Sequence, residues 1–208
     1  MKSFWAYLGG TIVAPGRTFR ALQSDPKMVA KGFKAILLIG GLYIVTVALL
    51  AAGGALITAP AVLAISAENY YFFEVFFALP VCVAGWILAA GAARLMSRWG
   101  RGSGTFEGTL AALGFAVTVA MFLTWATETV FAVLLVLGMS QEEFMDLIAQ
   151  SKFLQVFGWA YQIAAVSWML LLAMIAVGVS QKLAWWRAVV VGLLTTIVFM
   201  AVMLVFIR

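Results

Sequence analysis

The stretch RLMSRWGRGSGTFEGTLAALG, residues 94–114, separates two long apolar runs and carries three arginines and five of the chain's nineteen glycines. It admits two interpretations: a glycine-rich loop that cradles a phosphate, or a turn between two membrane helices. A P-loop needs the pattern Gly-x4-Gly-Lys-Ser/Thr, but Gly104 is followed by Thr105 and no lysine lies between Lys34 and Lys152. No buried strand precedes the loop, as nucleotide-binding fingerprints require. We therefore favour the turn and expect no nucleotide ligand.

The residue types of this stretch are those of a cytoplasmic turn. Its arginines suit the carboxyl end of a membrane helix, where cations reach water and complement the helix dipole. Its alternating glycines supply the permissive backbone that a chain reversal needs. Thr105 is placed to cap the next helix, and Glu107 falls in the first turn of that helix.

The composition of the whole chain agrees with a membrane location. Of its 208 residues, 65% are hydrophobic and 10% are charged, whereas soluble domains are about 45–50% apolar and about 25% charged. A spanning helix needs roughly 20 apolar residues. We therefore predict an all-α, polytopic helix bundle in which residues 1–208 form one membrane domain. Five runs qualify as spans: about 35–58, 72–93, 109–137, 155–179 and 186–207.

The first run continues as far as Pro60, where a proline ends one helix and a short outer segment follows. Six spans are therefore the alternative to five. The third run is about 43 Å long as a straight helix, against a hydrocarbon core of about 30 Å, so we expect it to tilt or protrude.

The distribution of basic residues predicts the orientation of the bundle. With five crossings and a cytoplasmic N-terminus, eleven of the thirteen basic residues fall on the cytoplasmic side, as the positive-inside rule requires. An odd number of crossings places the C-terminus across the membrane. The basic residues on the cytoplasmic side are Lys2, Arg17, Arg20, Lys27, Lys31, Lys34, Arg94, Arg98, Arg101, Lys182 and Arg187.

The N-terminal segment, residues 1–33, is predicted to stay in the cytoplasm or at the interface. It has no convincing signal-peptide cleavage site before Pro15. Asp25 and Pro26 form a helix-start pair, so a helix is expected to begin there and to run into the first span. Six cations of this side are predicted to contact lipid headgroups: Lys27, Lys31, Lys34, Arg94, Arg98 and Arg101.

A second surface segment is expected on the far side of the membrane, at residues 140–152. Ser140 and Glu143 form a capping box, and the apolar residues that follow fall on one helical face. We predict a short amphipathic helix on the membrane surface. The alternative is a helix that docks on a partner protein.

The stretch GSGTFEGTLAALGFA, residues 102–116, resembles the central signature of the Yip1 domain family. APGRTFRAL (14–22) and SWMLLLAMIAVGVSQKLAWWRAVVVGLL (167–194) are similar to other parts of that family, in the same order. This resemblance implies five helices with a cytoplasmic N-terminus and the C-terminus across the membrane. It also implies vesicle trafficking and small-GTPase contact in eukaryotic relatives that carry long cytosolic N-terminal regions. The compact chain resembles the bacterial branch.

The inventory of reactive groups argues against catalysis. The chain has no histidine and one cysteine, Cys82, which lies in an apolar run. We therefore predict no catalytic residues, no metal site and no cofactor.

Two carboxylates near the outer interface are the strongest candidates for a ligand site. Glu74 and Glu128 lie in apolar runs, where acids are costly and often functional. Glu128 lies about 28 Å along the helix from Thr109, close to the outer interface. The candidate outer-leaflet pocket, for a cation, a proton or a lipid headgroup, comprises Glu74, Thr124, Glu128, Tyr161 and Gln162. Acids that simply reach the outer water are the alternative.

Small residues predict where helices pack. Gly85, Ala89 and Ala93 recur every four positions, which lets two helix backbones approach closely. Packing within the bundle is the first interpretation, and contact with a partner's helices is the second.

The leading functional hypothesis is a non-catalytic scaffold or accessory protein of the bacterial cytoplasmic (inner) membrane. Its expected partners are the lipid bilayer, other integral membrane proteins or further copies of itself, and no nucleic acid is expected. A small transporter or lipid- or ion-handling protein that uses the pocket around Glu74 and Glu128 is the alternative. An intramembrane enzyme ranks third, because without histidine it would depend on carboxylates, lysine or tyrosine.

Overall fold

The computed structural model describes residues 2–58, 60 and 62–207, and this part of the chain contains helices and no strand. The elements in chain order are α1 (Phe4–Val13), α2 (Pro15–Gln23), α3 (Met28–Ala52), the 3-10 helix η1 (Ala67–Asn69), α4 (Tyr70–Trp99), α5 (Phe106–Val136), α6 (Gln141–Gln150), α7 (Lys152–Gln181) and α8 (Trp185–Phe206).

Five of the described helices, α3, α4, α5, α7 and α8, are long and apolar enough to cross a membrane. The prediction of an all-α bundle with five candidate spans is thus confirmed. The six-span alternative is not supported, because the described residues between Gly53 and Ser66 form no helix. The five spans pack side by side in a closed ring in the order α3, α4, α8, α7, α5.

The first span differs from its predicted limits at both ends. It ends at Ala52 rather than near residue 58, because Gly53 and Gly54 follow and Gly54 has a φ of +69°. It begins at Met28, with Lys27 as its N-cap residue. Asp25 acts two residues before that cap, since its Oδ1 accepts a hydrogen bond from the Lys27 backbone N–H at 3.0 Å.

The predicted amphipathic helix at residues 140–152 corresponds to α6 and carries the capping box. The Ser140 hydroxyl accepts from the Glu143 N–H at 3.1 Å, and a Glu143 carboxylate oxygen accepts from the Ser140 N–H at 2.7 Å. These two bonds satisfy backbone donors that would otherwise be left open at the helix start.

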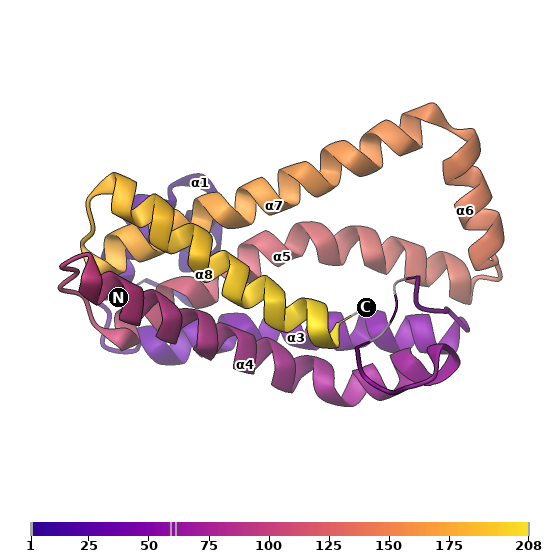
Figure 1. The fold of residues 1–208 in the computed structure, drawn as a ribbon, viewed down its shortest axis with the longest axis horizontal. Coiled ribbons are helices and arrows are strands. Elements are labelled where there is room, and N and C mark those ends of the chain that lie inside the picture. The colour runs from indigo at the N-terminus through magenta and orange to yellow at the C-terminus, as the bar shows by residue number, and fades with distance from the viewer. Residues whose placement is uncertain (1, 59, 61, 208) are drawn as a thin grey trace.

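The connections between the spans gather at two ends of the bundle (Figure 1). We call one end the basic end, because the connections from α2 to α3, α4 to α5 and α7 to α8 lie there with the exposed cations Lys27, Arg98, Arg101 and Lys182. We call the other end the α6 end, since α6 and the segment from α3 to α4 lie there. The N-terminal part of the chain is at the basic end, and α8 runs away from it.

The first half of α5 is the centre of the molecule. Every residue from 108 to 121 is buried, on all faces of the helix, which is the pattern of a helix enclosed by other helices. The N-terminal helices help to close this enclosure. Phe4 and Tyr7 of α1 pack against the Phe115 ring with centroid distances of 5.7 and 5.9 Å. The N-terminal segment is thus part of the bundle's core at the basic end.

Candidate functional site

The glycine-rich loop between α4 and α5 passes directly against the end of α7. A Cβ atom at Gly104 would overlap the Ser180 carbonyl oxygen and would lie 2.7 Å from the Gln181 Cα atom. The Ser103 N–H donates to the Gln181 carbonyl oxygen at 3.1 Å. Glycine is therefore required at position 104 by close backbone approach.

The buried Gln181 side chain joins three helix ends at this loop. Its Oε1 accepts from Nη1 of Arg94 at 2.9 Å, and its Nε2 donates to the Thr105 carbonyl oxygen at 3.0 Å and to the Thr109 hydroxyl. The Thr109 hydroxyl also pairs with that of Ser180 at 3.1 Å. Because buried amides and hydroxyls are costly unless bonded, this network fixes the register of α4, α5 and α7.

The backbone amides of the loop bond within the chain. Those of Gly100, Arg101, Gly102 and Ser103 donate to carbonyl oxygens of α4 or α7 at 2.7–3.3 Å. A phosphate-cradling loop directs its amides at the ligand instead. The loop therefore has the bonding pattern of a turn that joins helix ends.

The six cations predicted to contact headgroups divide into two groups. Lys27, Lys34, Arg98 and Arg101 are exposed. Lys31 forms an ion pair with Asp25 at 2.5 Å and donates to the Lys2 carbonyl oxygen at 2.8 Å, while Arg94 is bonded to Gln181. Thus Lys31 and Arg94 hold elements of the protein together, and the other four cations are open to the surroundings.

Asp25 is the centre of a second polar cluster at the basic end. The Lys31 ammonium and the Lys27 N–H both bond its carboxylate, and Tyr7 donates to it at 3.0 Å. These bonds lower the pKa of Asp25 to about 2 despite its burial, and the bond from Lys31 has the largest effect. The cluster ties α1 to the start of α3.

A cavity of about 180 Å³ lies between α3, α5, α7 and α8, towards the α6 end. Two of the predicted pocket residues, Thr124 and Glu128, line it with Tyr43, and most of the remaining wall is apolar. Glu74 is fully buried on α4 and is not part of that wall.

The two predicted pocket residues on α7 lie outside this cavity. The Tyr161 hydroxyl donates to the Leu123 carbonyl oxygen at 2.8 Å and accepts from the Thr127 hydroxyl. Gln162 is exposed on another face of α7. Tyr161 therefore joins α7 to α5, and of the five predicted residues Thr124 and Glu128 line the cavity.

The small residues of α4 face α8. Ala89 and Ala93 are buried, and a Cβ atom at Gly85 would meet the Phe199 ring at 3.3 Å and the Val202 side chain at 3.5 Å. This placement corresponds to packing within the bundle.

The half of α7 near the α6 end is the least enclosed part of any span. Figure 1 shows α7 diverging from α5 towards α6, and none of residues 152–164 is buried. Leu154, Gly158 and Tyr161 are half-buried and fall on one side of the helix, where the Tyr161 hydroxyl bonds α5. We call the remaining apolar surface the α7 face: Phe153, Val156, Phe157, Trp159, Ala160, Ile163, Ala164 and Val166.

A larger cavity, at the basic end, was not anticipated from the sequence. It lies between α2, α7 and α8 and is bordered by Arg20 and Lys182. From the sequence, both residues are expected only to add charge on the cytoplasmic side. The amphipathic character of α2, with Phe19 and Leu22 buried and Arg20 exposed, was the available signal that this segment packs on the bundle.

A bundle of five long apolar helices, with polar side chains joining their ends, defines a polytopic α-helical integral membrane protein. The model of the Yip1 domain matches residues 9–207, and the chain belongs to that family. Members of this family are generally non-enzymatic membrane proteins. Comparisons with curated proteins and with solved structures find no match.

Proposed function

We propose that this chain is a non-catalytic scaffold or accessory protein of the bacterial cytoplasmic membrane, which associates laterally with other integral membrane proteins. The observation that carries the proposal is the α7 face. A spanning helix at the edge of a bundle ordinarily buries a broad stripe against its neighbours. Half of α7 instead has no buried residue and leaves most of its surface to the bilayer or to a partner.

The chemistry of the α7 face suits contact with another helix. Phe153, Phe157 and Tyr161 form a ladder of stacked rings with centroid distances of 6.2 and 6.3 Å. Ala160 and Ala164 are four residues apart, share a side of the helix with Phe157 and are both exposed. Small residues at this spacing let a second helix approach closely, and rigid aromatic side chains beside them serve as anchors.

The proposal is tested by photo-crosslinking in native membranes. A photoreactive amino acid at Ala160 is expected to give a discrete protein adduct, either with another membrane protein or with a second copy of this chain. The matched control places the same group at Val190 of α8, which is also an exposed apolar site on a span. Lipid adducts alone at both positions would contradict the scaffold role.

A second candidate function is suggested by the cavity that Glu128 and Thr124 line. A carboxylate and a hydroxyl facing a cavity within the outer half of the bundle suit a small transporter or an ion- or lipid-handling protein. The replacement Glu128→Gln tests it in proteoliposomes. This function requires loss of proton or cation flux with unchanged folding, and equal flux in both proteins argues against it.

A further inference from the structure

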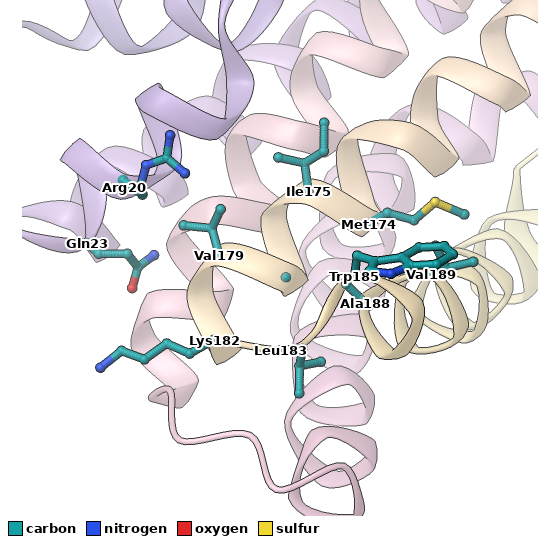
Figure 2. A pocket seen from close by; sticks show the side chains of 11 residues that line it. Arg20, Gln23, Met174, Ile175, Val179, Lys182, Leu183, Trp185, Ala188 and Val189 are labelled. Atoms are coloured by element: carbon teal, nitrogen blue, oxygen red, sulfur yellow. The ribbon is translucent and has the colours of Figure 1, made fainter.

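The cavity at the basic end has a volume of about 670 Å³ and opens between three elements (Figure 2). Arg20 and Gln23 come from α2, Met174, Ile175 and Val179 from the last turns of α7, and Trp185 from the start of α8. This volume falls in the range of small-molecule pockets, about 300–1,000 Å³.

Two cations border this cavity, and both are held on ordered elements. Arg20 lies on α2, which is fixed by the buried Phe19 and Leu22 and by a 2.9 Å bond from Nε2 of Gln23 to the Gly108 carbonyl oxygen. Lys182 ends α7 in a left-handed conformation, with a φ of 54°. The positions from which both side chains extend are therefore set by the fold.

Neither cation is neutralised within the described part of the chain. The ion pair found among the described residues joins Lys31 to Asp25, and Arg20 and Lys182 are both exposed. Figure 2 shows Arg20, Gln23 and Lys182 on one side of the cavity. This side therefore offers positive charge to an anion.

The rest of the cavity wall is apolar. Figure 2 shows Ile175 and Val179 next to the polar side, and Met174 with the Trp185 indole beyond them. Because α7 ends and α8 begins here, the cavity lies where two candidate spans leave the membrane. Tryptophan at this depth is typical of the boundary between headgroups and acyl chains.

We propose that this cavity binds one anionic phospholipid, with the phosphate between Arg20 and Lys182 and the first acyl carbons against Val179, Met174 and Trp185. A fully soluble anion would gain nothing from the apolar wall, and a zwitterionic lipid such as phosphatidylcholine would bring its own cation close to Arg20 and Lys182. Basic pockets between membrane helices bind such headgroups in other proteins. This site is separate from the α7 face and stands whether or not the scaffold role holds.

The test is native mass spectrometry of the detergent-solubilised full chain with phosphatidylglycerol and, separately, phosphatidylcholine. We expect wild type to retain one phosphatidylglycerol in preference to phosphatidylcholine. The double variant Arg20→Gln/Lys182→Gln is expected to weaken that binding by roughly thirtyfold, since each of the two cations near an anionic lipid contributes roughly fivefold. The matched control, Arg17→Gln/Lys27→Gln, removes the same charge from exposed positions outside the cavity and should bind like wild type.

Two outcomes would overturn the proposal: an equal loss in both double variants, which indicates diffuse electrostatic attraction, or displacement of the lipid by millimolar inorganic phosphate, which indicates a soluble anion site. A photoreactive phosphatidylglycerol gives an independent readout in the unmodified protein. Adducts on residues 174–189 support the site, whereas adducts confined to α3 contradict it.

Discussion

At the scale of single residues, Gly104 in the loop of the basic end and Gly91 in α4 show that glycine has different roles in this protein. Gly104 lies against the backbone of Ser180 and Gln181, whereas Gly91, inside α4, has open space where a Cβ atom would be. The sequence marks both as glycine, and only the neighbouring helix distinguishes them. The two positions therefore make a matched pair for measurement.

The substitution Gly104→Ala is expected to lower the free energy of unfolding by about 1–3 kcal/mol, because the new methyl group forces the loop away from α7. Gly91→Ala should be neutral or should stabilise by up to about 1 kcal/mol, since alanine favours the helix. The sole cysteine, Cys82, is buried, so its reaction with a fluorescent thiol reagent during heating reports unfolding in detergent. Equal midpoints for the two variants would contradict the close approach at Gly104.

The Asp25 cluster predicts a dependence of stability on acid pH. The pKa of Asp25 is lowered from 3.8 to about 2 in the folded chain, so its contribution is complete above pH 3.8 and is lost as the pH falls towards 2. We expect the thermal midpoint, followed by circular dichroism, to fall in this window. The variant Asp25→Asn should be less stable than wild type at pH 6 and should lack this part of the decline, whereas an identical pH profile would refute the role of the carboxylate.

At the scale of elements, the crossing of α3 and α5 explains why the first half of α5 is rich in glycine and alanine. A Cβ atom at Gly114 would lie 2.6 Å from the Gly32 carbonyl oxygen, and one at Gly32 would lie 2.8 Å from the Ala111 Cα atom. The two backbones are thus in direct contact, as small residues permit in membrane bundles. Trp86 of α4 adds a bond from its indole N–H to the Leu110 carbonyl oxygen at 2.8 Å.

The variant Gly114→Ala is expected to separate α3 from α5 and to destabilise the bundle by about 1–3 kcal/mol or more, because backbone atoms have no rotamer with which to yield. Gly41→Ala is the control on α3, since nothing lies within 4 Å of its Cβ position. The thiol-reactivity assay on Cys82 measures both. A Gly114→Ala protein as stable as the control would show that this crossing is looser than the structure indicates.

At the scale of the whole molecule, the separation of the basic end from the α6 end predicts the orientation in the membrane. Each connection of the basic end holds an exposed cation, namely Lys27, Arg101 or Lys182, and such loops stay on the cytoplasmic side. We expect Ser103→Cys to be protected from a membrane-impermeant maleimide in intact cells, and Glu142→Cys to be labelled. Both positions are exposed, and a Cys82→Ser background removes the native thiol. Labelling of Ser103→Cys but not of Glu142→Cys would show the opposite orientation and would contradict this prediction.

The amino-acid sequence alone determined the class of the molecule and the approximate limits of its spans. Apolar runs longer than the bilayer core must form helices there, because hydrocarbon offers no partner for backbone amides. The capping box at Ser140 and Glu143 is likewise local, so it placed α6. The predicted end of the first span was less accurate, because Gly53 and Gly54 end α3 before Pro60.

The tertiary structure decided which polar residues meet. Arg94 and Lys31 looked equivalent to the other cations along the chain, but the fold places Gln181 beside one and Asp25 beside the other. Glu74 and Glu128 lie at similar predicted depths, yet only Glu128 faces the cavity, because helix rotation selects the side of α4 and α5 that each presents. Arg20 and Lys182, 162 positions apart in sequence, border one cavity only because α2 packs on α7. Contacts between distant segments depend on helix rotation and packing, which hydropathy does not encode.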